Sequence, residues 1–218
     1  YLRARGAAGP DWSKLIGGSE GTLGIVFSAT LRVTPLPKSK GLAVLFFDDP
    51  AESFEAAAAL QALAPVAIEY VDDVLFDQTR GQRAFQPARD FLELDAKPCR
   101  IFLMVEFYNN ELDGLAELAR RFPGVRMKVC ATAAEMALVW GLRKAGLSLL
   151  TGRPGLAKPV PGIEDVCVPA ARLPEYTAAL RALFARAEVE ASFYGHAGAG
   201  LLHVRPVLNL RTAEGLKK

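Results

Sequence analysis

The chain contains only two histidines, His196 and His203, and both lie in one glycine-rich segment. Side chains seven residues apart on a straight strand point to opposite faces, because they alternate with a period of two. Gly195, Gly198 and Gly200 permit a tight reversal that would bring the two imidazoles together. Two converging imidazoles make half of a transition-metal site, which needs a third ligand, usually a carboxylate, from elsewhere. The alternative is a pair of histidines hydrogen-bonded to the backbone of a turn or strand.

A second candidate is Arg143, which falls on the apolar stripe of a predicted helix. The stripe consists of Met136, Val139, Trp140 and Arg143. A buried guanidinium is costly unless it meets an anion. We therefore expect Arg143 either to pair with an internal Asp or Glu or to face an anionic ligand.

A third candidate, Lys158, lies in a loop rich in glycine and proline, residues 152–162. The prolines on its C-terminal side stiffen the loop and would fix the position of the lysine. Together with Arg143 and the two histidines, Lys158 would suit a small carboxylate ligand. The alternative is an ordinary solvated loop lysine.

Glycines also crowd residues 17–24, which are followed by a β-rich run at 25–33 and a Pro-x-Pro stretch that ends at Pro37. They mark a loop where the backbone approaches something closely. No Gly-Lys-Ser/Thr follows, so this is not a Walker A loop, and a strand rather than a helix follows, which excludes a Rossmann fingerprint. The alternative is a plain turn before a strand.

Beyond Pro37, strand-like and helix-like patterns alternate. Strands are predicted at residues 42–47, 66–71, 100–108, 125–130 and 163–168, with two more inside 190–208. Helices are predicted at 50–64, 112–122, 132–146 and from Pro174 to about residue 187. This order predicts an α+β fold, with an antiparallel sheet covered by helices on one side and a ferredoxin-like character.

Composition excludes several classes of protein. The 218 residues carry 26 basic and 24 acidic side chains, which gives no electrostatic indication of nucleic-acid binding. No apolar run approaches the roughly 18–20 residues of a membrane span. The three cysteines, Cys99, Cys130 and Cys167, are far apart and set in or beside apolar runs, which favours buried thiols in a reducing compartment over disulfides. We expect a cytoplasmic protein, with peripheral attachment to the inner membrane face as the alternative.

Two stretches together resemble a known family. Residues 16–37, which begin Ile-Gly-Gly-Ser-Glu-Gly-Thr-Leu-Gly-Ile-Val, look like the last motif of the flavin domain in vanillyl-alcohol-oxidase-type flavoproteins. Residues 192–206, Ser-Phe-Tyr-Gly-His-Ala-Gly-Ala-Gly-Leu-Leu-His-Val-Arg-Pro, resemble the histidine motif in the C-terminal domain of FAD-linked oxidases. Within that group the chain resembles the glycolate oxidase D-subunit and D-lactate dehydrogenase branch, especially bacterial forms fused to iron–sulfur domains.

The resemblance implies a role for each candidate. Residues 1–37 would be the C-terminal strip of a FAD-binding domain, and residues 38–218 a substrate or cap domain. Arg143 and Lys158 would hold the substrate carboxylate, and His196 and His203 would bind a divalent metal, commonly zinc. The residues that would line the FAD, mainly through backbone groups, are Glu20, Gly21, Thr22, Leu23, Gly24, Ile25 and Val26.

The resemblance also implies a reaction. The metal would bind a small 2-hydroxy acid of the D-lactate or glycolate type and lower the pKa of its hydroxyl, while a hydride passes from the α-carbon to FAD. Electrons would leave through an iron–sulfur domain or a quinone or cytochrome chain. The family motif usually has Asp and Asn where this chain has Ala199 and Leu201, which puts metal affinity and substrate choice in question.

The ends of the chain bear on what it could do alone. It opens at Tyr1 without a methionine and ends at Lys218, so we expect an excised segment. Most of the flavin domain would precede it, and a Glu-His pair that supplies the third ligand and the base would follow it. Alone, it should bind flavin weakly or not at all and should not turn over. The alternatives are a non-catalytic metal- or ligand-binding ferredoxin-like module with a degraded site, and an oligomerisation or docking surface for an iron–sulfur electron acceptor.

Overall fold

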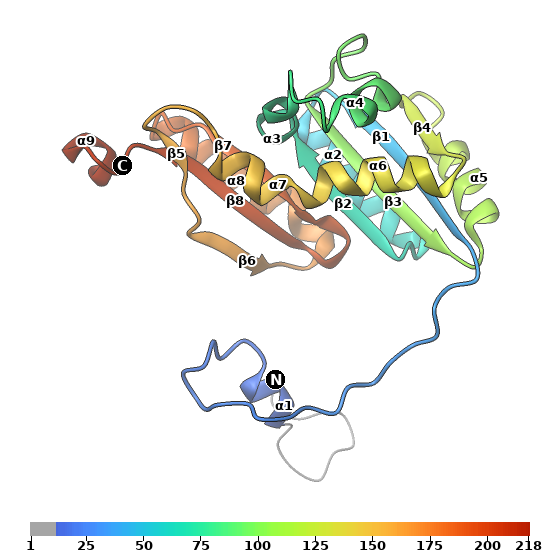
Figure 1. The fold of residues 1–218 in the computed structure, drawn as a ribbon, viewed down its shortest axis with the longest axis horizontal. Helices are drawn as coiled ribbons and strands as arrows, with labels where there is room; N and C mark the ends of the chain where they lie inside the picture. Colours follow the sequence, from blue (N-terminus) through green and yellow to red (C-terminus); the bar gives the residue numbers. More distant parts are fainter. Residues whose placement is uncertain (1–11) are drawn as a thin grey trace. The chain divides into compact units, whose positions relative to one another are not determined.

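The computed structural model describes residues 12–218, apart from the side chain of Asp165. Backbone contacts divide the chain into two compact units, one that ends at Leu36 and one over Pro37–Lys218. Residues 1–11 of the predicted flavin-domain strip lie outside the described residues. All the strands described below belong to the second unit (Figure 1).

The first half of the second unit forms the ferredoxin-like arrangement that the sequence predicts. Its elements are β1 (Lys40–Phe47), α2 (Pro50–Leu60), β2 (Ala67–Asp72), β3 (Ile101–Tyr108), α5 (Glu111–Arg121) and β4 (Met127–Cys130). The strands lie in the order β4-β1-β3-β2, and each neighbouring pair is antiparallel. Consequently β3 lies between the parallel strands β1 and β2, and β1 lies between β3 and β4, as two split β-α-β units require.

The second half continues the same sheet. Its elements are α6 (Ala133–Lys144), α7 (Gly146–Thr151), β5 (Lys158–Pro159), β6 (Ile163–Cys167), α8 (Leu173–Arg186), β7 (Ala191–His196) and β8 (Leu201–Leu208). Strand β7 pairs with β2 and β8, and β8 also pairs with β5 and β6. Among the described residues the sheet therefore has eight strands. The two short helices α3 (Asp73–Phe76) and α4 (Gln86–Leu92) connect β2 to β3.

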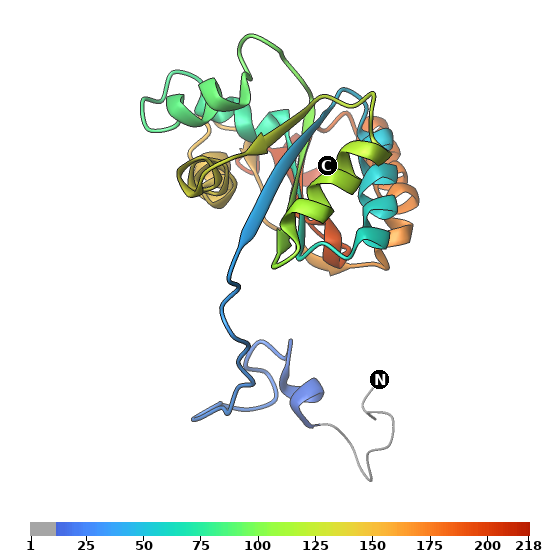
Figure 2. The same ribbon diagram turned by 90° about the vertical axis from the view of Figure 1, so that its right-hand side faces the viewer.

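Helices cover both faces of the sheet, which corrects the expectation of cover on one side (Figure 2). One apolar core lies between the sheet and helices α2, α5 and α8, and includes Leu45, Phe54 and Phe184. The other lies between the sheet and helices α3, α4, α6 and α7, and includes Val44 and Leu142. The apolar runs of β1 and β3 are continuous rather than alternating, and such strands need cover on both faces.

Helix starts follow the local signals in the sequence. Thr132 and Glu135 form a capping box at the start of α6, with each side chain bonded to the backbone of the other. The Asp49 carboxylate caps α2, which has Pro50 at its first turn. These caps fix where α6 begins and hence which of its residues face the sheet.

The first unit contains the short helix α1 (Trp12–Ile16) and no strand among residues 12–36. The predicted strand at 25–33 is therefore wrong for this structure. Ile25, Phe27 and Val33 alternate as strand residues do, yet each is more than four-fifths exposed. A strand needs a hydrogen-bonded neighbour, and no described residue pairs with this segment.

The cysteines are free thiols, as predicted, but only in part buried. Cys130 lies in the second core, and burial raises its pKa to about 12. Cys99 is half-buried, whereas Cys167 is exposed, which corrects the expectation of burial for this residue. Cys167 ends β6, which pairs with β8 alone among the described strands. No described helix combines the length and apolar character that a bilayer crossing demands.

Candidate functional site

The two histidines stand at the end of the β7–β8 hairpin. His196 is the last residue of β7, a 3-10 turn at Ala197–Ala199 follows, and His203 lies opposite Tyr194 in the register of the hairpin. The imidazole centroids are 6.0 Å apart. The predicted reversal that brings the two rings together is therefore confirmed.

The reversal depends on Gly200. Its φ is +72°, in the left-handed region, and a Cβ there would stand 1.8 Å from the Val168 carbonyl oxygen. Because Val168 follows β6 directly, Gly200 lets the hairpin turn close against the neighbouring strand. The Val168 amide in turn donates to the Gly200 carbonyl at 3.0 Å.

A buried carboxylate, Glu69 on β2, connects His196 to Arg143. The His196 Nδ1 lies 2.6 Å from Glu69 Oε1. On the other side of the carboxylate, Arg143 donates from Nε to Oε2 at 2.8 Å, and its Nη2 lies 2.7 Å from the same oxygen. The Glu69 side chain is 5% exposed and that of His196 is 51% exposed, so the imidazole reaches from a buried ion pair to the surface.

Arg143 reaches Glu69 from α6, where the predicted stripe faces the sheet. Val139 on the same stripe is fully buried, and Arg143 is buried beside it. Trp140, the residue after Val139, also belongs to this stripe, and its indole donates to Glu106 Oε1 at 3.2 Å. Of the two alternatives that the sequence left for Arg143, the structure shows the ion pair with an internal carboxylate.

A second group of charged side chains surrounds His203. The His203 Nδ1 lies 3.7 Å from Glu164 Oε2 on β6. Arg205, two residues further along β8, pairs through Nη2 with Glu164 Oε1. Arg205 is 2% exposed, and its Nη1 is a buried donor with no hydrogen-bond partner among the described residues.

The Tyr194 ring separates the two groups. Its centroid lies 5.2 Å from the Arg143 guanidinium carbon, 5.7 Å from that of Arg205 and 5.0 Å from the His203 ring. Arg205 Nε donates to the Tyr194 hydroxyl at 3.1 Å. Burial raises the pKa of Tyr194, so the phenol stays neutral and its face attracts both guanidiniums.

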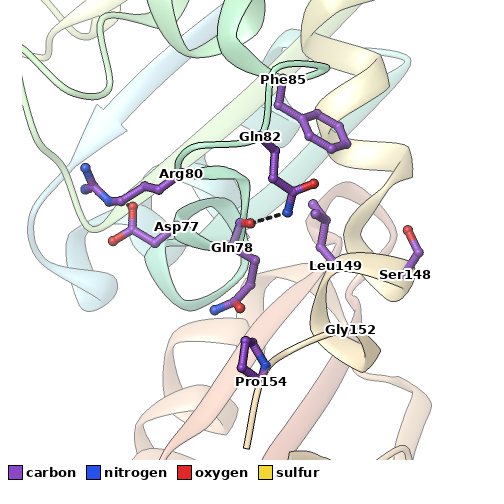
Figure 3. Close-up of a pocket in the computed structure, with 9 residues that line it drawn as sticks. All are labelled: Asp77, Gln78, Arg80, Gln82, Phe85, Ser148, Leu149, Gly152 and Pro154. Atoms are coloured by element: carbon purple, nitrogen blue, oxygen red, sulfur yellow. Dashed lines mark hydrogen bonds and ion pairs between the residues drawn. The ribbon is translucent and has the colours of Figure 1, made fainter.

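Two adjoining hollows open near these groups. One of about 320 Å³ is lined by Gln61, Glu69, His196 and Ala199 among others, and the next, of about 560 Å³, by Glu106 and Trp140 among others. Val66 and Ala67 line both hollows. A third hollow of about 560 Å³ lies elsewhere, between the segment after α3 and helix α7, and contains none of the predicted site residues (Figure 3).

The structure leaves Lys158 apart from the histidines. Lys158 is exposed and its Nζ donates to the Arg153 carbonyl. It pairs with Leu208, five residues along β8 from His203, a rise of roughly 17 Å at about 3.3 Å per residue. A role for Lys158 beside Arg143 stays a prediction.

The predicted FAD-lining residues Glu20–Val26 lie in the first unit and are exposed. Their backbone is turn-like: Glu20 has φ +50° and Gly21 φ +78°, and the Thr22 amide donates to the Ser19 carbonyl at 2.9 Å. The exposed backbone suits close approach by a ligand, and their contact with FAD stays a prediction.

The donor set around the histidines fits two ligands of a metal site. The Glu69 carboxylate is hydrogen-bonded to Nδ1 of His196. Histidines that bind a metal through Nε2 commonly have such a carboxylate at Nδ1. Among the described side chains, which do not include that of Asp165, no group of three His, Cys, Asp or Glu residues is placed to hold a metal ion by itself. A complete site would therefore take a further ligand from outside these residues.

Sequence reasoning missed Glu69, Glu164, Arg205 and Tyr194. Glu69 stands in the apolar run of β2, Ala-Ile-Glu-Tyr-Val, and a charged residue inside a buried strand needs a partner. Arg205 gives the same signal in β8. Both could have been found by asking what a charged residue does at a buried strand position.

Comparison with known proteins defines the class. The family model for the C-terminal domain of FAD linked oxidases matches residues 36–218. The chain therefore belongs to the family of FAD-linked oxidase C-terminal domains. The family predicted from the two motifs is confirmed, and so is the antiparallel α+β fold.

Curated relatives are named as 2-hydroxy-acid dehydrogenases and oxidases. D-2-hydroxyglutarate dehydrogenase of Escherichia coli (strain K12) is 29% identical, with 92% of this chain and 21% of the relative covered. D-lactate dehydrogenase of Anaerostipes hadrus is 28% identical, with 91% and 42% covered. Glycolate oxidase subunit GlcD of Bacillus subtilis (strain 168) is 23% identical, with 99% and 45% covered. The chain thus spans about a fifth of the first relative and less than half of the other two.

Solved structures are similar in fold. An alkyldihydroxyacetonephosphate synthase matches 97% of this chain and 43% of its own chain, with a TM-score of 0.61 and 16% identity. At that identity the similarity shows a shared fold and carries no assignment of substrate.

Proposed function

We propose that this chain is the substrate domain of a flavin-dependent dehydrogenase that oxidises a small 2-hydroxy acid of the D-lactate or glycolate type. The observation that carries the proposal is the Arg143–Glu69–His196 group, beside a second histidine, in a chain of the FAD-linked oxidase family. The names of the relatives, which act on 2-hydroxyglutarate, lactate and glycolate, support the substrate class.

In this proposal the flavin lies against the first unit, where Glu20–Val26 contribute exposed backbone groups. FAD, when bound, supplies the acceptor for the hydride that leaves the α-carbon of the acid. The chain's own residues bind and orient the acid beside the two imidazoles. The hollow lined by Glu69 and His196 is the proposed place of binding, and at about 320 Å³ it accommodates a small acid.

The charges already present favour a metal in this site. Arg143 is bound to Glu69, and Arg205 to Glu164, so each guanidinium already faces a carboxylate. A substrate carboxylate that entered here would share these guanidiniums with Glu69 and Glu164, so the arginines could orient it but would not by themselves bind it tightly. We therefore infer that His196 and His203 hold a divalent cation such as zinc, which would polarise the substrate hydroxyl and lower its pKa.

The proposal also assigns a binding group to the substrate carboxylate and an acceptor to the electrons. Arg143, with Lys158 as its proposed partner, would orient the substrate carboxylate. Reduced flavin needs an electron acceptor, for which an iron–sulfur domain or a quinone or cytochrome chain is the proposed partner.

The test is an assay of the full-length protein with bound flavin. D-lactate, glycolate and D-2-hydroxyglutarate are offered in turn with a redox dye as acceptor, and we expect dye reduction with at least one of them. His203→Ala should abolish this activity and the stoichiometric metal together. Bound flavin without oxidation of any 2-hydroxy acid would refute the substrate class and would favour a non-catalytic binding module.

A further inference from the structure

The hollow lined by Glu106 and Trp140 adjoins the proposed place of substrate binding. Val66 and Ala67, at the start of β2, line both this hollow and the smaller one beside His196. Its volume is about 560 Å³, against about 320 Å³ for the smaller hollow. Glycolate has no side chain and lactate has only a methyl group. Neither acid, bound beside His196, would fill the larger hollow.

The lining of the larger hollow is mostly apolar and aromatic. Helix α6 contributes several of these side chains from one face, because residues three and four apart on a helix are neighbours. The apolar and aromatic lining residues are Val66, Ala67, Tyr108, Met136, Ala137 and Trp140. Such a surface binds an apolar group by removing its area from water, which is worth about fourfold in affinity for each buried CH₂.

Three charged side chains, Lys40, Glu106 and Lys144, also line the larger hollow. Glu106 is buried and accepts from the Trp140 indole at 3.2 Å, so a distal carboxylate on a substrate would meet a like charge. Both lysines are exposed, and the Lys40 ammonium lies 5.1 Å from the centroid of the Tyr108 ring. An exposed cation gains little from an ion pair. The lining therefore favours a neutral side chain over an anionic one.

We propose that the larger hollow receives the side chain of the substrate and selects 2-hydroxy acids with an apolar side chain larger than the methyl group of lactate. The proposal rests on the proposed function, in which the 2-hydroxy acid group binds beside His196. From there the side chain passes Val66 and Ala67 and lies against Trp140. Ala137, as a small residue of the lining, leaves room for it.

The experiment compares three acids in the full-length flavoprotein with a redox dye as acceptor. They are D-lactate, D-2-hydroxy-4-methylpentanoate and D-2-hydroxyglutarate, and the last two are similar in size but differ in distal charge. One methylene group in an apolar pocket is worth about 10–200-fold in kcat/KM. We therefore expect kcat/KM for D-2-hydroxy-4-methylpentanoate to exceed that for D-lactate at least about 10-fold. An equal or lower value, or a preference for D-2-hydroxyglutarate, would overturn the proposal and leave the proposed function standing.

Ala137→Phe tests whether the larger hollow is responsible for the preference. The phenyl group would fill the hollow, so the ratio of kcat/KM for D-2-hydroxy-4-methylpentanoate to that for D-lactate should fall at least about 10-fold. Ala134→Phe is the matched control, because Ala134 is exposed on the same helix and lies outside the lining of the hollow. This variant should leave the ratio unchanged. Equal effects of the two substitutions would overturn the proposal.

Calorimetry separates this proposal from the proposed function, because it measures binding whether or not an acid is oxidised. The probe is D-2-hydroxy-4-methylpentanoate, added to the full-length protein. Binding that Ala137→Phe weakens and Ala134→Phe does not, without oxidation of any acid, would uphold the side-chain site and refute the proposed reaction. Absence of binding by all three acids would overturn both.

Discussion

At the scale of single residues, the site is built from charges that the fold has buried in pairs. Glu69 and Arg143 belong to β2 and α6 and meet away from water. Such a pair contributes little net stability when intact, because desolvation of both ions offsets their attraction. Removal of one partner, however, leaves the other charge buried and uncompensated, which lowers the free energy of unfolding strongly. Stability measurements on single variants therefore test whether the pair is buried.

Arg143→Met should destabilise the chain strongly. The change keeps a long side chain but leaves the Glu69 carboxylate buried without its cation, at a cost of about 3–5 kcal/mol. Arg172→Met is the control, since Arg172 and Glu175 form an exposed pair whose removal should cost at most about 1 kcal/mol. Urea unfolding measures both free energies, and equal losses would contradict the buried ion pair.

Asp72 should make stability depend on pH. Burial raises its pKa from 3.8 to about 7, although it accepts hydrogen bonds from Ser192, Phe193 and Leu75. Between about pH 4 and pH 7 the folded chain therefore keeps a proton that the unfolded chain has lost, so the free energy of unfolding falls as pH rises through this window. Asp72→Asn should flatten that slope in urea titrations across the window. An unchanged slope would show that Asp72 ionises normally in the fold.

At the scale of elements, the site depends on the β7–β8 hairpin. Four strands meet at its histidines: β2 brings Glu69, β6 brings Glu164, and the two strands of the hairpin bring the rings. The turn must therefore place His196 and His203 together and also fit under the end of β6.

Gly200→Ala tests this turn. The new Cβ would clash with the Val168 carbonyl, and an alanine at φ +72° carries about 1–3 kcal/mol of strain before that clash. We expect a marked loss of stability and a weakening of the contact between the imidazoles in proton NMR. Gly141→Ala is the control, because Gly141 lies in α6 with open space around it, and there alanine should stabilise by about 0.5–1 kcal/mol. A neutral Gly200→Ala would contradict the left-handed turn at this position.

The sequence predicts these elements well and their partners poorly. The hairpin, the capping box of α6 and the inward position of Arg143 all follow from local patterns, because glycines, caps and helical stripes act within a few residues. The identity of the carboxylate that meets Arg143 depends on β2 and α6 coming together, and residues 69 and 143 lie far apart in the chain. The continuous apolar runs of β1 and β3 do indicate cover on both faces of the sheet, a signal that the one-sided expectation overlooked.

At the scale of the whole molecule, the chain consists of two units of different character. Both apolar cores lie within Pro37–Lys218. The described residues of the first unit instead expose apolar side chains, among them Ile25, Phe27 and Leu36. An exposed apolar segment of this kind is typical of a surface that a partner covers.

Removal of residues 1–36 should leave the second unit folded. Since neither core includes any of the described residues 12–36, we expect the free energy of unfolding in urea to change by no more than about 0.5 kcal/mol, the usual range for changes away from a core. The same deletion should reduce self-association, which light scattering measures, because it removes the exposed apolar segment. A large loss of stability would show that the first unit is part of the folded core.

Anaerobic mixing of the full-length flavoprotein with each acid tests the proposed hydride transfer from a 2-hydroxy acid to flavin. The flavin absorbance should bleach with at least one of D-lactate, glycolate and D-2-hydroxyglutarate. Bleaching should be slower when the α-carbon carries deuterium, since that C–H bond breaks in the step observed. A flavin that stays oxidised with every acid would contradict the proposed function.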